Sequence, residues 1–346
     1  MRKIELVPGY EISPVIKGGW QLSAGHSLDS TISEEVAIAE IISFIDAGIS
    51  TLDFGDIYIG VEVLIGKALA KIQERDGSSG RQKVQLHTKY VPNETSLDKY
   101  DSTDARKIVL RSLERLGVER VDLVQFHWWN YEARNYLAAL EQLFILKEDG
   151  HIREVGLTNF DLKRLTEIVE AGFTPASIQL QYSILDRRPE PEMVEYCLEL
   201  GIGILSYGTV AGGFLSERFI NQPEPTSFET RSAIKYKLII DEFGGWKLFQ
   251  ELLATLTPIA RSHNTDIGTI ASAFTLNSPG VKAVIVGARN LRHLSSNLSI
   301  PEIALTAADR AAIITILERS TGPLGEVYEL ERYDDGHRGI MHANNN

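Results

Sequence analysis

The chain has 346 residues, of which 43% are hydrophobic and 24% are charged, and its formal net charge is −12. This composition is typical of a globular protein with a large core. The negative charge disfavours nucleic acid and anionic membrane surfaces as partners, because both require a basic protein face.

Cysteine content and hydropathy argue against a disulfide-bonded secreted protein and against a membrane-spanning one. The only cysteine, Cys197, excludes an intrachain disulfide and lies in an amphipathic stretch, where we expect a small buried apolar side chain. No apolar run approaches the roughly 18 residues of a membrane-spanning helix, and the N-terminus lacks the apolar segment of a signal peptide. We therefore expect a cytoplasmic protein without membrane contact.

Short β-branched runs alternate with longer stretches of helical periodicity, which is typical of βαβ units and a parallel sheet. The predicted strands lie near residues 15–19, 50–54, 84–89, 121–127, 152–157, 177–181, 203–207 and 282–286. The predicted helices cover residues 33–47, 60–74, 103–117, 133–149, 161–171, 190–200, 246–263, 267–277, 289–298 and 307–319. The pattern predicts an α/β protein with a (β/α)8 TIM barrel, carrying extra helices after strand 7 and at the C-terminus.

The chain shows no internal repeat or linker, so we predict a single barrel domain over residues 1–346. The segment 219–232 is polar and contains prolines, which predicts an excursion on the surface. The last residues, 333–346, end in HANNN and predict a mobile tail.

Ionisable residues end successive predicted strands: Asp53, Lys89 and His127. The carboxyl ends of barrel strands are where such enzymes build their active sites. A lysine in the barrel interior requires a partner, which Asp53 can supply. Tyr58 follows Asp53 by five residues, and a nearby ammonium is expected to lower its phenol pKa from about 10. Each residue alone is more often structural, but together they indicate carbonyl chemistry with general acid catalysis.

The remaining histidines show no spacing typical of metal ligands, so we predict no metal site. This argues against a metal-dependent barrel hydrolase.

The stretch LDFGDIYIGVEVLIGKAL resembles a strand–loop–helix segment of the aldo-keto reductase superfamily. TKY around Lys89 and DLVQFHW around His127 match the next two catalytic strands of that family. Further motifs follow in the family's order: IREVGLTNF, QLQYSIL, ILSYGTVAGGFLS and IVGARNLRHLSSNL. The resemblance covers nearly the whole chain.

The resemblance implies an NAD(P)H-dependent oxidoreductase that interconverts an aldehyde, ketone or sugar and the corresponding alcohol. Tyr58 would be the general acid, and Lys89 and Asp53 would tune its pKa. His127 would hydrogen-bond the substrate carbonyl oxygen, so that two donors converge on that atom.

The resemblance also implies a set of cofactor contacts along the downstream motifs. These are Gly19, Trp20, Thr158, Asn159, Gln179, Tyr207, Gly208, Thr209, Gly213, Leu215, Gly287, Arg289, His293 and Asn297. A guanidinium at Arg289 suits a 2′-phosphate, so we expect NADPH, while His293 and Ser296 leave NADH possible. Trp20 and Trp128 are expected to border the substrate, and Trp129 to pack within its loop.

One alternative of a different class stays open. Potassium-channel β subunits resemble this superfamily and act through a partner, and such subunits can retain the same catalytic residues. The loops 20–32, 90–102 and 128–135 and the segment 320–340 are expected to set specificity. Their mixture of aromatic and polar residues leaves an aromatic aldehyde and a sugar both open, together with reaction direction and oligomeric state.

Overall fold

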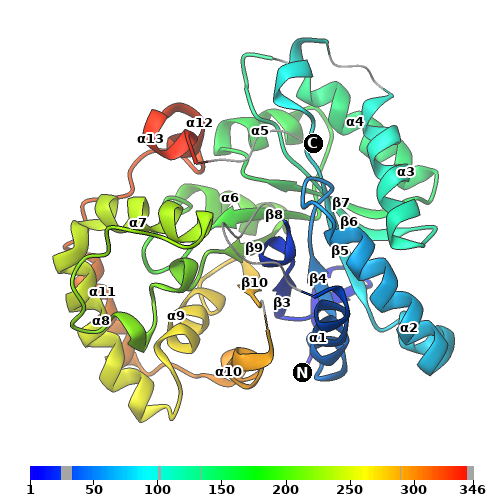
Figure 1. Cartoon of the computed structure of the whole chain (residues 1–346). Coiled ribbons are helices and arrows are strands. Elements are labelled where there is room, and N and C mark those ends of the chain that lie inside the picture. The colour runs from blue at the N-terminus through cyan, green and yellow to red at the C-terminus, as the bar shows by residue number, and fades with distance from the viewer. Residues whose placement is uncertain (25–32, 100–102, 134, 289, 341–346) are drawn as a thin grey trace.

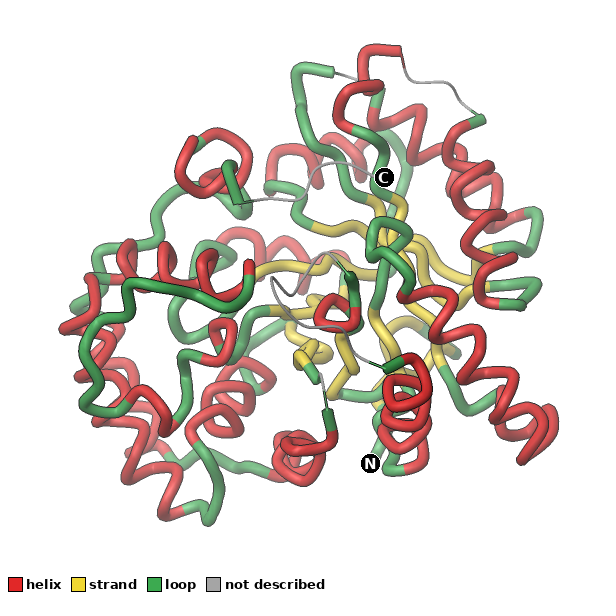
Figure 2. The backbone as a smooth tube through the Cα atoms, in the orientation of Figure 1, coloured by secondary structure: helices red, strands yellow, loops and turns green. Residues whose placement is uncertain are grey.

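The computed structural model describes residues 1–24, 33–99, 103–133, 135–288 and 290–340. Eight parallel strands close into a barrel in the order β10-β3-β4-β5-β6-β7-β8-β9. The strands are β3 (Val15–Gly18), β4 (Thr51–Asp53), β5 (Gln85–Tyr90), β6 (Val121–Phe126), β7 (Ile152–Thr158), β8 (Ser177–Gln181), β9 (Gly203–Tyr207) and β10 (Val281–Gly287). Helices surround them as an outer layer (Figures 1 and 2). The predicted (β/α)8 barrel and all eight of its strands are confirmed.

The helices that follow the barrel strands agree with the predicted segments. They are α1 (Glu34–Asp46), α2 (Val61–Arg81), α3 (Asp104–Leu116), α4 (Tyr136–Glu148), α5 (Leu162–Glu170), α6 (Glu192–Leu200), α9 (Ile267–Leu276) and α10 (Leu294–Ser299). The additional helices are α7 (Arg231–Phe243) and α8 (Gly245–Ser262) after the seventh barrel strand, and α11 (Ala307–Leu317), α12 (Glu329–Tyr333) and α13 (Asp335–Arg338) at the C-terminal end. The sequence did not predict α7, which begins inside the segment read as a polar excursion.

Local sequence explains how these helices face the barrel and where they end. In α3 the buried residues Ala105, Val109, Leu113 and Leu116 recur at helical spacing and pack inward. Gly117 ends this helix with φ +65°, and its N–H bonds the carbonyls of Leu113 and Glu114.

A short hairpin at the N-terminus was not predicted and closes the end of the barrel opposite the active-site end. It comprises β1 (Ile4–Val7) and β2 (Tyr10–Ile12), which pair antiparallel. Leu6, Tyr10 and Ile12 join a buried cluster with barrel residues such as Leu123. The Tyr10 hydroxyl lies 2.8 Å from Nε2 of His87, inside the barrel.

Strand register staggers the predicted catalytic residues by two positions from one strand to the next. Asp53 pairs with His87, two residues before Lys89, and Lys89 pairs with Gln125, two residues before His127. Because side chains alternate along each strand, the members that point inward meet at the carboxyl end of the barrel.

A second core supports the long excursion after β9. Helices α7, α8, α9 and α11 share a buried cluster that contains Phe214, Ile240, Phe249, Ile270 and Ile313. Figure 1 shows α7, α8 and α11 together on one side of the barrel, away from α2 and α3. This core positions the N-terminal turn of α7 at the barrel mouth.

The predicted mobile tail is corrected for its first half. Residues 335–338 form α13, and His337 is buried, with its ring 3.6 Å from Glu242. Arg338 pairs with Glu94 at 2.5 Å. His337 and Arg338 therefore attach this stretch to the rest of the protein while most of its residues are exposed, and residues 341–346 lie outside the described part of the chain.

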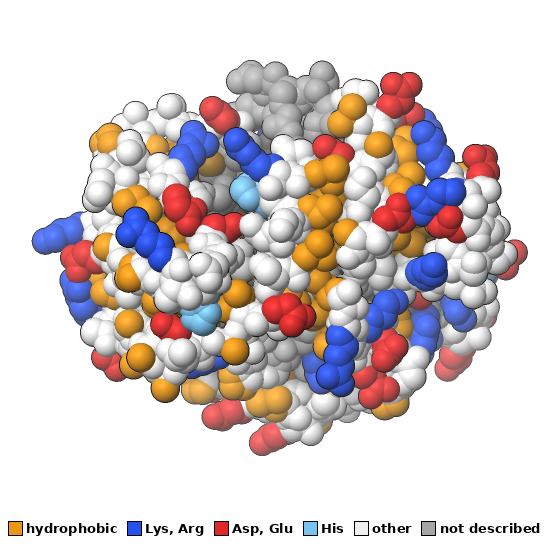
Figure 3. Space-filling model, turned by 90° about the horizontal axis from the view of Figure 1, so that it is seen from below, with side chains coloured by type: hydrophobic (Ala, Val, Ile, Leu, Met, Phe, Trp, Pro, Cys, Tyr) orange, Lys and Arg blue, Asp and Glu red, His pale blue; other side chains and the backbone are white. Residues whose placement is uncertain are grey.

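On the face drawn in Figure 3, Lys and Arg side chains are interspersed with Asp and Glu. Across the described residues, no helix combines the length and apolar character needed to cross a membrane.

Candidate active site

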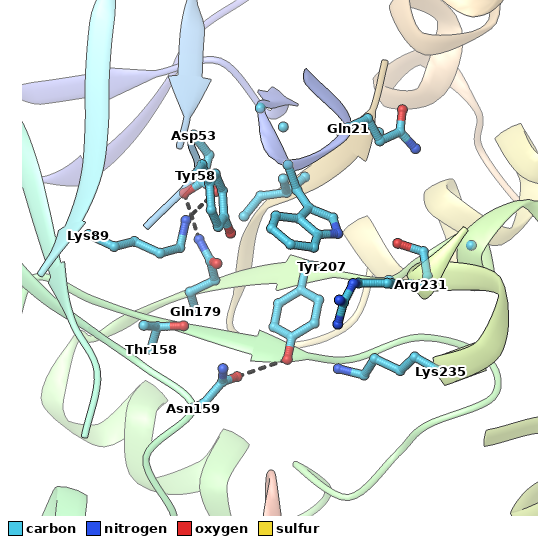
Figure 4. Close-up of a pocket in the computed structure, with 18 of the residues that line it drawn as sticks. Gln21, Asp53, Tyr58, Lys89, Thr158, Asn159, Gln179, Tyr207, Arg231 and Lys235 are labelled. Atoms are coloured by element: carbon cyan, nitrogen blue, oxygen red, sulfur yellow. Dashed lines mark hydrogen bonds and ion pairs between the residues drawn. The ribbon is translucent and has the colours of Figure 1, made fainter. Parts of the chain in front are cut away.

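A cavity of about 260 Å³ opens at the carboxyl ends of the barrel strands. Most of the residues predicted for the site line it. They are Gly19, Trp20, Asp53, Tyr58, Lys89, His127, Thr158, Asn159, Gln179, Tyr207, Gly208, Thr209 and Gly287. Figure 4 shows Asp53, Tyr58 and Lys89 grouped on one side of Tyr207, with Arg231 and Lys235 on the other.

An ion pair between Lys89 and Asp53 forms the base of the site. Lys89 Nζ lies 2.6 Å from Asp53 Oδ1, and both side chains are almost completely buried. The same ammonium donates to the Phe54 carbonyl at 2.8 Å, while the amides of Gln125 and Gln179 each donate to Asp53 Oδ2 at 2.7 Å. Burial alone would lower the pKa of Lys89, but the charges and hydrogen bonds of Asp53 and Tyr58 together outweigh it and raise the pKa above its ordinary value. Lys89 therefore stays charged, as the predicted pairing requires.

Tyr58 lies in the turn after β4, directly beside this pair. Its ring centre is 5.1 Å from Lys89 Nζ and 5.1 Å from the Trp20 ring. The expected fall in its pKa is wrong: burial raises the pKa of Tyr58, and the Lys89 charge only partly opposes that rise. The phenol thus stays protonated at neutral pH.

His127 presents an unsatisfied nitrogen at the site. Its Nδ1 lies 3.2 Å from the Thr158 carbonyl, and no hydrogen-bond partner is found for its buried Nε2 among the described residues. Burial, together with the nearby Arg332 charge, lowers the pKa of His127 to about 3, so the ring is neutral. A carbonyl oxygen only accepts, so the proton of the neutral ring is on Nδ1 and Nε2 carries a lone pair. The structure therefore does not show the two converging donors that we expected.

The two tryptophans after His127 exchange their predicted roles. Trp128 is fully buried, packs against Phe126 and donates through Nε1 to the Ala133 carbonyl at 2.8 Å. Trp129 lines the cavity, and its ring meets His127 edge-on at 4.4 Å. The expectation for Trp128 is wrong because the alternation of β6 continues past Phe126: Trp128 shares the outward face with Phe126, and Trp129 shares the inward face with His127.

The residues expected around the nicotinamide lie together. The Tyr207 hydroxyl donates to Asn159 Oδ1 at 2.9 Å, and Asn159 holds a left-handed backbone with φ +60°. Thr209 bonds Ser272 at 2.9 Å, so its hydroxyl is already engaged. Gly213 and Leu215 do not line the cavity, and Leu215 is instead buried in the core beneath it.

The expected adenine end is only partly brought to the site. His293 and Asn297 lie in the segment after β10 but do not line the cavity. Ser296 donates to Asp266 at 2.6 Å. Arg289, the residue expected to meet a 2′-phosphate, lies outside the described residues.

Sequence reasoning missed four lining residues of α7, which are Arg231, Ser232, Lys235 and Tyr236. In the segment 320–340, which was expected to set specificity, it singled out no residue, and the structure places Tyr328 and Ile340 of that segment at the cavity. None of them ends a barrel strand or belongs to a quoted motif. The only available signal was the helical spacing of Arg231 and Lys235 across one turn, directly after the polar excursion.

The lining residues fit a nicotinamide dinucleotide. Tyr207 offers a flat ring, and the amides of Asn159 and Gln179 stand beside it as groups for a carboxamide. Nε of Arg231 is buried without a hydrogen-bond partner among the described residues, which suits an anionic group such as a phosphate. Within the described part of the chain, no three His, Cys, Asp or Glu side chains are grouped so as to hold a metal ion.

A closed parallel barrel with this tyrosine, lysine, carboxylate and histidine at its mouth defines an oxidoreductase site of the barrel class. The Aldo/keto reductase family model matches residues 14–318. The chain belongs to the aldo/keto reductase family, a membership that makes it an NAD(P)-dependent oxidoreductase.

Individual members of the family are similar to this chain over most of its length. The chain is 25% identical over 331 residues to the NADH-specific methylglyoxal reductase of Escherichia coli K12, covering 89% of this chain and 96% of the relative. It is 27% identical over 320 residues to the chloroplastic pyridoxal reductase of Arabidopsis thaliana, covering 86% and 80% respectively. A glycerol dehydrogenase structure from Gluconobacter oxydans, 24% identical, has the same fold with a TM-score of 0.76, covering 93% of this chain and 97% of its own.

Removing Asp53 alone should destabilise the protein more than removing the whole ion pair. Asp53→Asn leaves the buried Lys89 ammonium without its counter-charge, and we expect the free energy of unfolding to fall by about 3–5 kcal/mol. In the double variant Asp53→Asn, Lys89→Met the loss should be smaller, because no charge remains buried. Urea denaturation of both variants measures the difference.

The exposed pair Arg106–Asp149, at 2.7 Å, is the matched control. Asp149→Asn should cost no more than about 1 kcal/mol. A double variant Asp53→Asn, Lys89→Met that loses as much free energy of unfolding as Asp53→Asn alone, or more, would contradict this account.

Proposed function

We propose that the protein reduces an aldehyde or ketone to the alcohol with NADPH or NADH, using Tyr58 as the proton donor. The observation that carries the proposal is the buried Lys89–Asp53 pair directly beside the Tyr58 ring. A buried charged pair beside an ionisable side chain in a cavity is typical of a functional site. The reverse reaction uses the same residues with Tyr58 as base.

The bound nicotinamide would supply hydride to the carbonyl carbon. The chain's own residues would supply the proton and orient the oxygen of the substrate. Tyr58 holds its proton at neutral pH and can release it toward an oxygen that gains negative charge, because Lys89 stabilises the phenolate left behind. Asp53 keeps Lys89 in place and charged.

His127 has a role that follows from its tautomer. With the proton on Nδ1, its Nε2 accepts a hydrogen bond from the hydroxyl of the alcohol without any change in the ring. To donate to a carbonyl oxygen, the neutral ring must move its proton to Nε2 and lose the Thr158 contact. We therefore assign His127 to orienting the alcohol form of the substrate beside Tyr58.

Cofactor contacts are proposed for Gly19, Trp20, Tyr207 and Gly208 around the nicotinamide, with Thr158, Asn159 and Gln179 at its carboxamide. Arg289 is proposed to face a 2′-phosphate, which favours NADPH. The methylglyoxal reductase relative is described as NADH-specific, and this supports keeping NADH as the alternative.

Titration with NADPH and NADH, followed by quenching of tryptophan fluorescence, tests the nucleotide site. We expect saturable quenching and tighter binding of NADPH. Arg289→Gln should weaken NADPH about tenfold with little change for NADH, because one charged hydrogen bond to phosphate is lost. Exposed Arg292 provides the control variant Arg292→Gln, which should change neither affinity. Saturable binding of neither nucleotide would remove the reductase proposal and favour a partner-binding role.

Tyr58→Phe should bind NADPH as the wild type does but lose turnover by a factor of about 10² or more, since only the proton donor is removed. Turnover of a reactive aldehyde and the fluorescence titration are measured on the same preparation. Normal turnover in this variant would show that another group supplies the proton.

The pH dependence should differ between the two directions. Because burial raises the pKa of Tyr58, its donor form persists through neutral pH, and kcat/KM for reduction should stay flat until strongly alkaline pH. Oxidation needs the phenolate, so its rate should rise with pH by up to about tenfold per unit. His127, with a pKa of about 3, should add no inflection near 6.5. An inflection there in the wild type, absent in His127→Gln, would contradict a neutral His127.

A further inference from the structure

Tyr328 covers the predicted catalytic residue His127. Its ring meets His127 edge-on at 5.6 Å, it lines the cavity, and it is almost completely buried. The residue holds a left-handed backbone with φ +62°, which is costly for a side chain of this size. Such a conformation persists only where the surroundings enforce it.

Two consecutive charged residues enforce it. Glu331 pairs with Arg188 at 3.1 Å and with Lys235 at 3.5 Å, and the Glu331 carboxylate is fully buried. Burial would raise the pKa of Glu331, but the charges of Lys235 and Arg188 lower it to about 2. Asp186 completes the cluster by pairing with Arg188 at 2.7 Å.

Arg332 anchors the same segment to the loops of the site. Its guanidinium donates to the carbonyls of Trp128, Trp129 and Asn159, the last two at 2.7 Å each. These contacts join the segment that carries Tyr328 to the loops after β6 and β7. Tyr328 is therefore fixed relative to both His127 and Trp129.

The cavity wall around Tyr58 is apolar and aromatic. It is made by Trp20, Ile57, Val91, Trp129, Tyr328 and Ile340. The Trp129 indole N–H is already used, since it donates to the Pro92 carbonyl at 2.9 Å. Among the side chains of this wall and its neighbours, the polar groups nearest a substrate are then the hydroxyls of Tyr58 and Tyr328 and the ring of His127.

The cations of the cavity are either paired or distant from this wall. Lys89 is paired with Asp53, and Lys235 with Glu331, its ammonium lying over the Tyr207 ring at 5.2 Å. Arg231 lies beyond Tyr207 from Tyr58 (Figure 4). The Lys235 ammonium also lies 5.5 Å from the Tyr328 ring, and the Arg332 guanidinium 5.4 Å from it. Lys235 is already paired with Glu331, and Arg332 already donates to backbone carbonyls, so neither is free to bind a carboxylate or phosphate.

Resting on the proposed function, we propose that Tyr328 is a specificity-determining residue that selects flat, uncharged aromatic aldehydes or ketones. A planar ring fits between facing aromatic side chains and gains from edge-on and offset contacts. A sugar would bring several hydroxyls against apolar walls, where their lost hydrogen bonds to water are not replaced. The structure thereby separates the two substrate classes that the loop composition left open.

The test compares kcat/KM for benzaldehyde, 4-carboxybenzaldehyde and D-glyceraldehyde with saturating NADPH or NADH. The wild type should prefer benzaldehyde over each of the others by about tenfold or more. Tyr328→Asn removes the ring but tolerates the left-handed backbone, so the segment should stay in place. This variant should lose about tenfold of the preference through a higher KM for benzaldehyde.

Two further variants show whether the Tyr328 ring itself causes the preference for benzaldehyde. Tyr328→Phe keeps the ring and should therefore retain the preference for benzaldehyde to within about threefold of the wild-type value. Tyr333→Asn alters an exposed tyrosine of the same segment that does not line the cavity, and it should leave all three values unchanged.

Equal or better turnover of D-glyceraldehyde by the wild type would overturn the proposal while leaving the reductase function intact. An unchanged preference in Tyr328→Asn would overturn the assignment to Tyr328. Failure to reduce any of the three carbonyls, despite nucleotide binding, would refute the proposed function and this inference together.

Discussion

The ion pair between Lys89 and Asp53 is the interaction on which the rest of the site depends. Two charges inside a barrel are tolerated only if their remaining hydrogen-bonding groups are satisfied, and here two glutamine amides and a backbone carbonyl do this. Those partners come from separate strands and the loop after β4. The barrel must therefore close in the correct register before the pair is stable, and a closed barrel in turn fixes Tyr58 beside the ammonium.

Burial around this pair has opposite consequences for its neighbours. It raises the pKa of Tyr58, keeping the proton on the phenol, and it lowers the pKa of His127, keeping the imidazole neutral. The lysine charge alone suggested a more acidic phenol. The structure shows that desolvation is the larger effect, because the turn after β4 is covered by Trp20 as well as approached by Lys89.

The sequence predicted the barrel and the strand-end residues because those signals are local. A strand's alternation and the residue that ends it can be read within ten positions, and Asp53, Lys89 and His127 follow from that alone. Applied two and three residues past β6, the same alternation would have assigned Trp128 to the core and Trp129 to the cavity, as the structure has them. Tyr328 could not be found this way: its place depends on Glu331 meeting Arg188, which is 143 positions earlier in the chain.

The C-terminal segment shows what the sequence could not predict. The tail was predicted over residues 333–346, and composition gave no sign that Glu331 and Arg332, directly before it, are among the most buried charges in the described chain. Because these two residues face opposite partners, a cationic cluster and a row of carbonyls, they fix the rotation of the segment as well as its position. That places the Tyr328 ring toward His127 and the Lys235 ammonium toward Tyr207. The described cavity consequently has aromatic walls above the Lys89–Asp53 pair, Lys235 between the rings of Tyr207 and Tyr328, and Arg231 beyond Tyr207. A single barrel thus presents an aromatic surface and cationic groups in one cavity without a second domain.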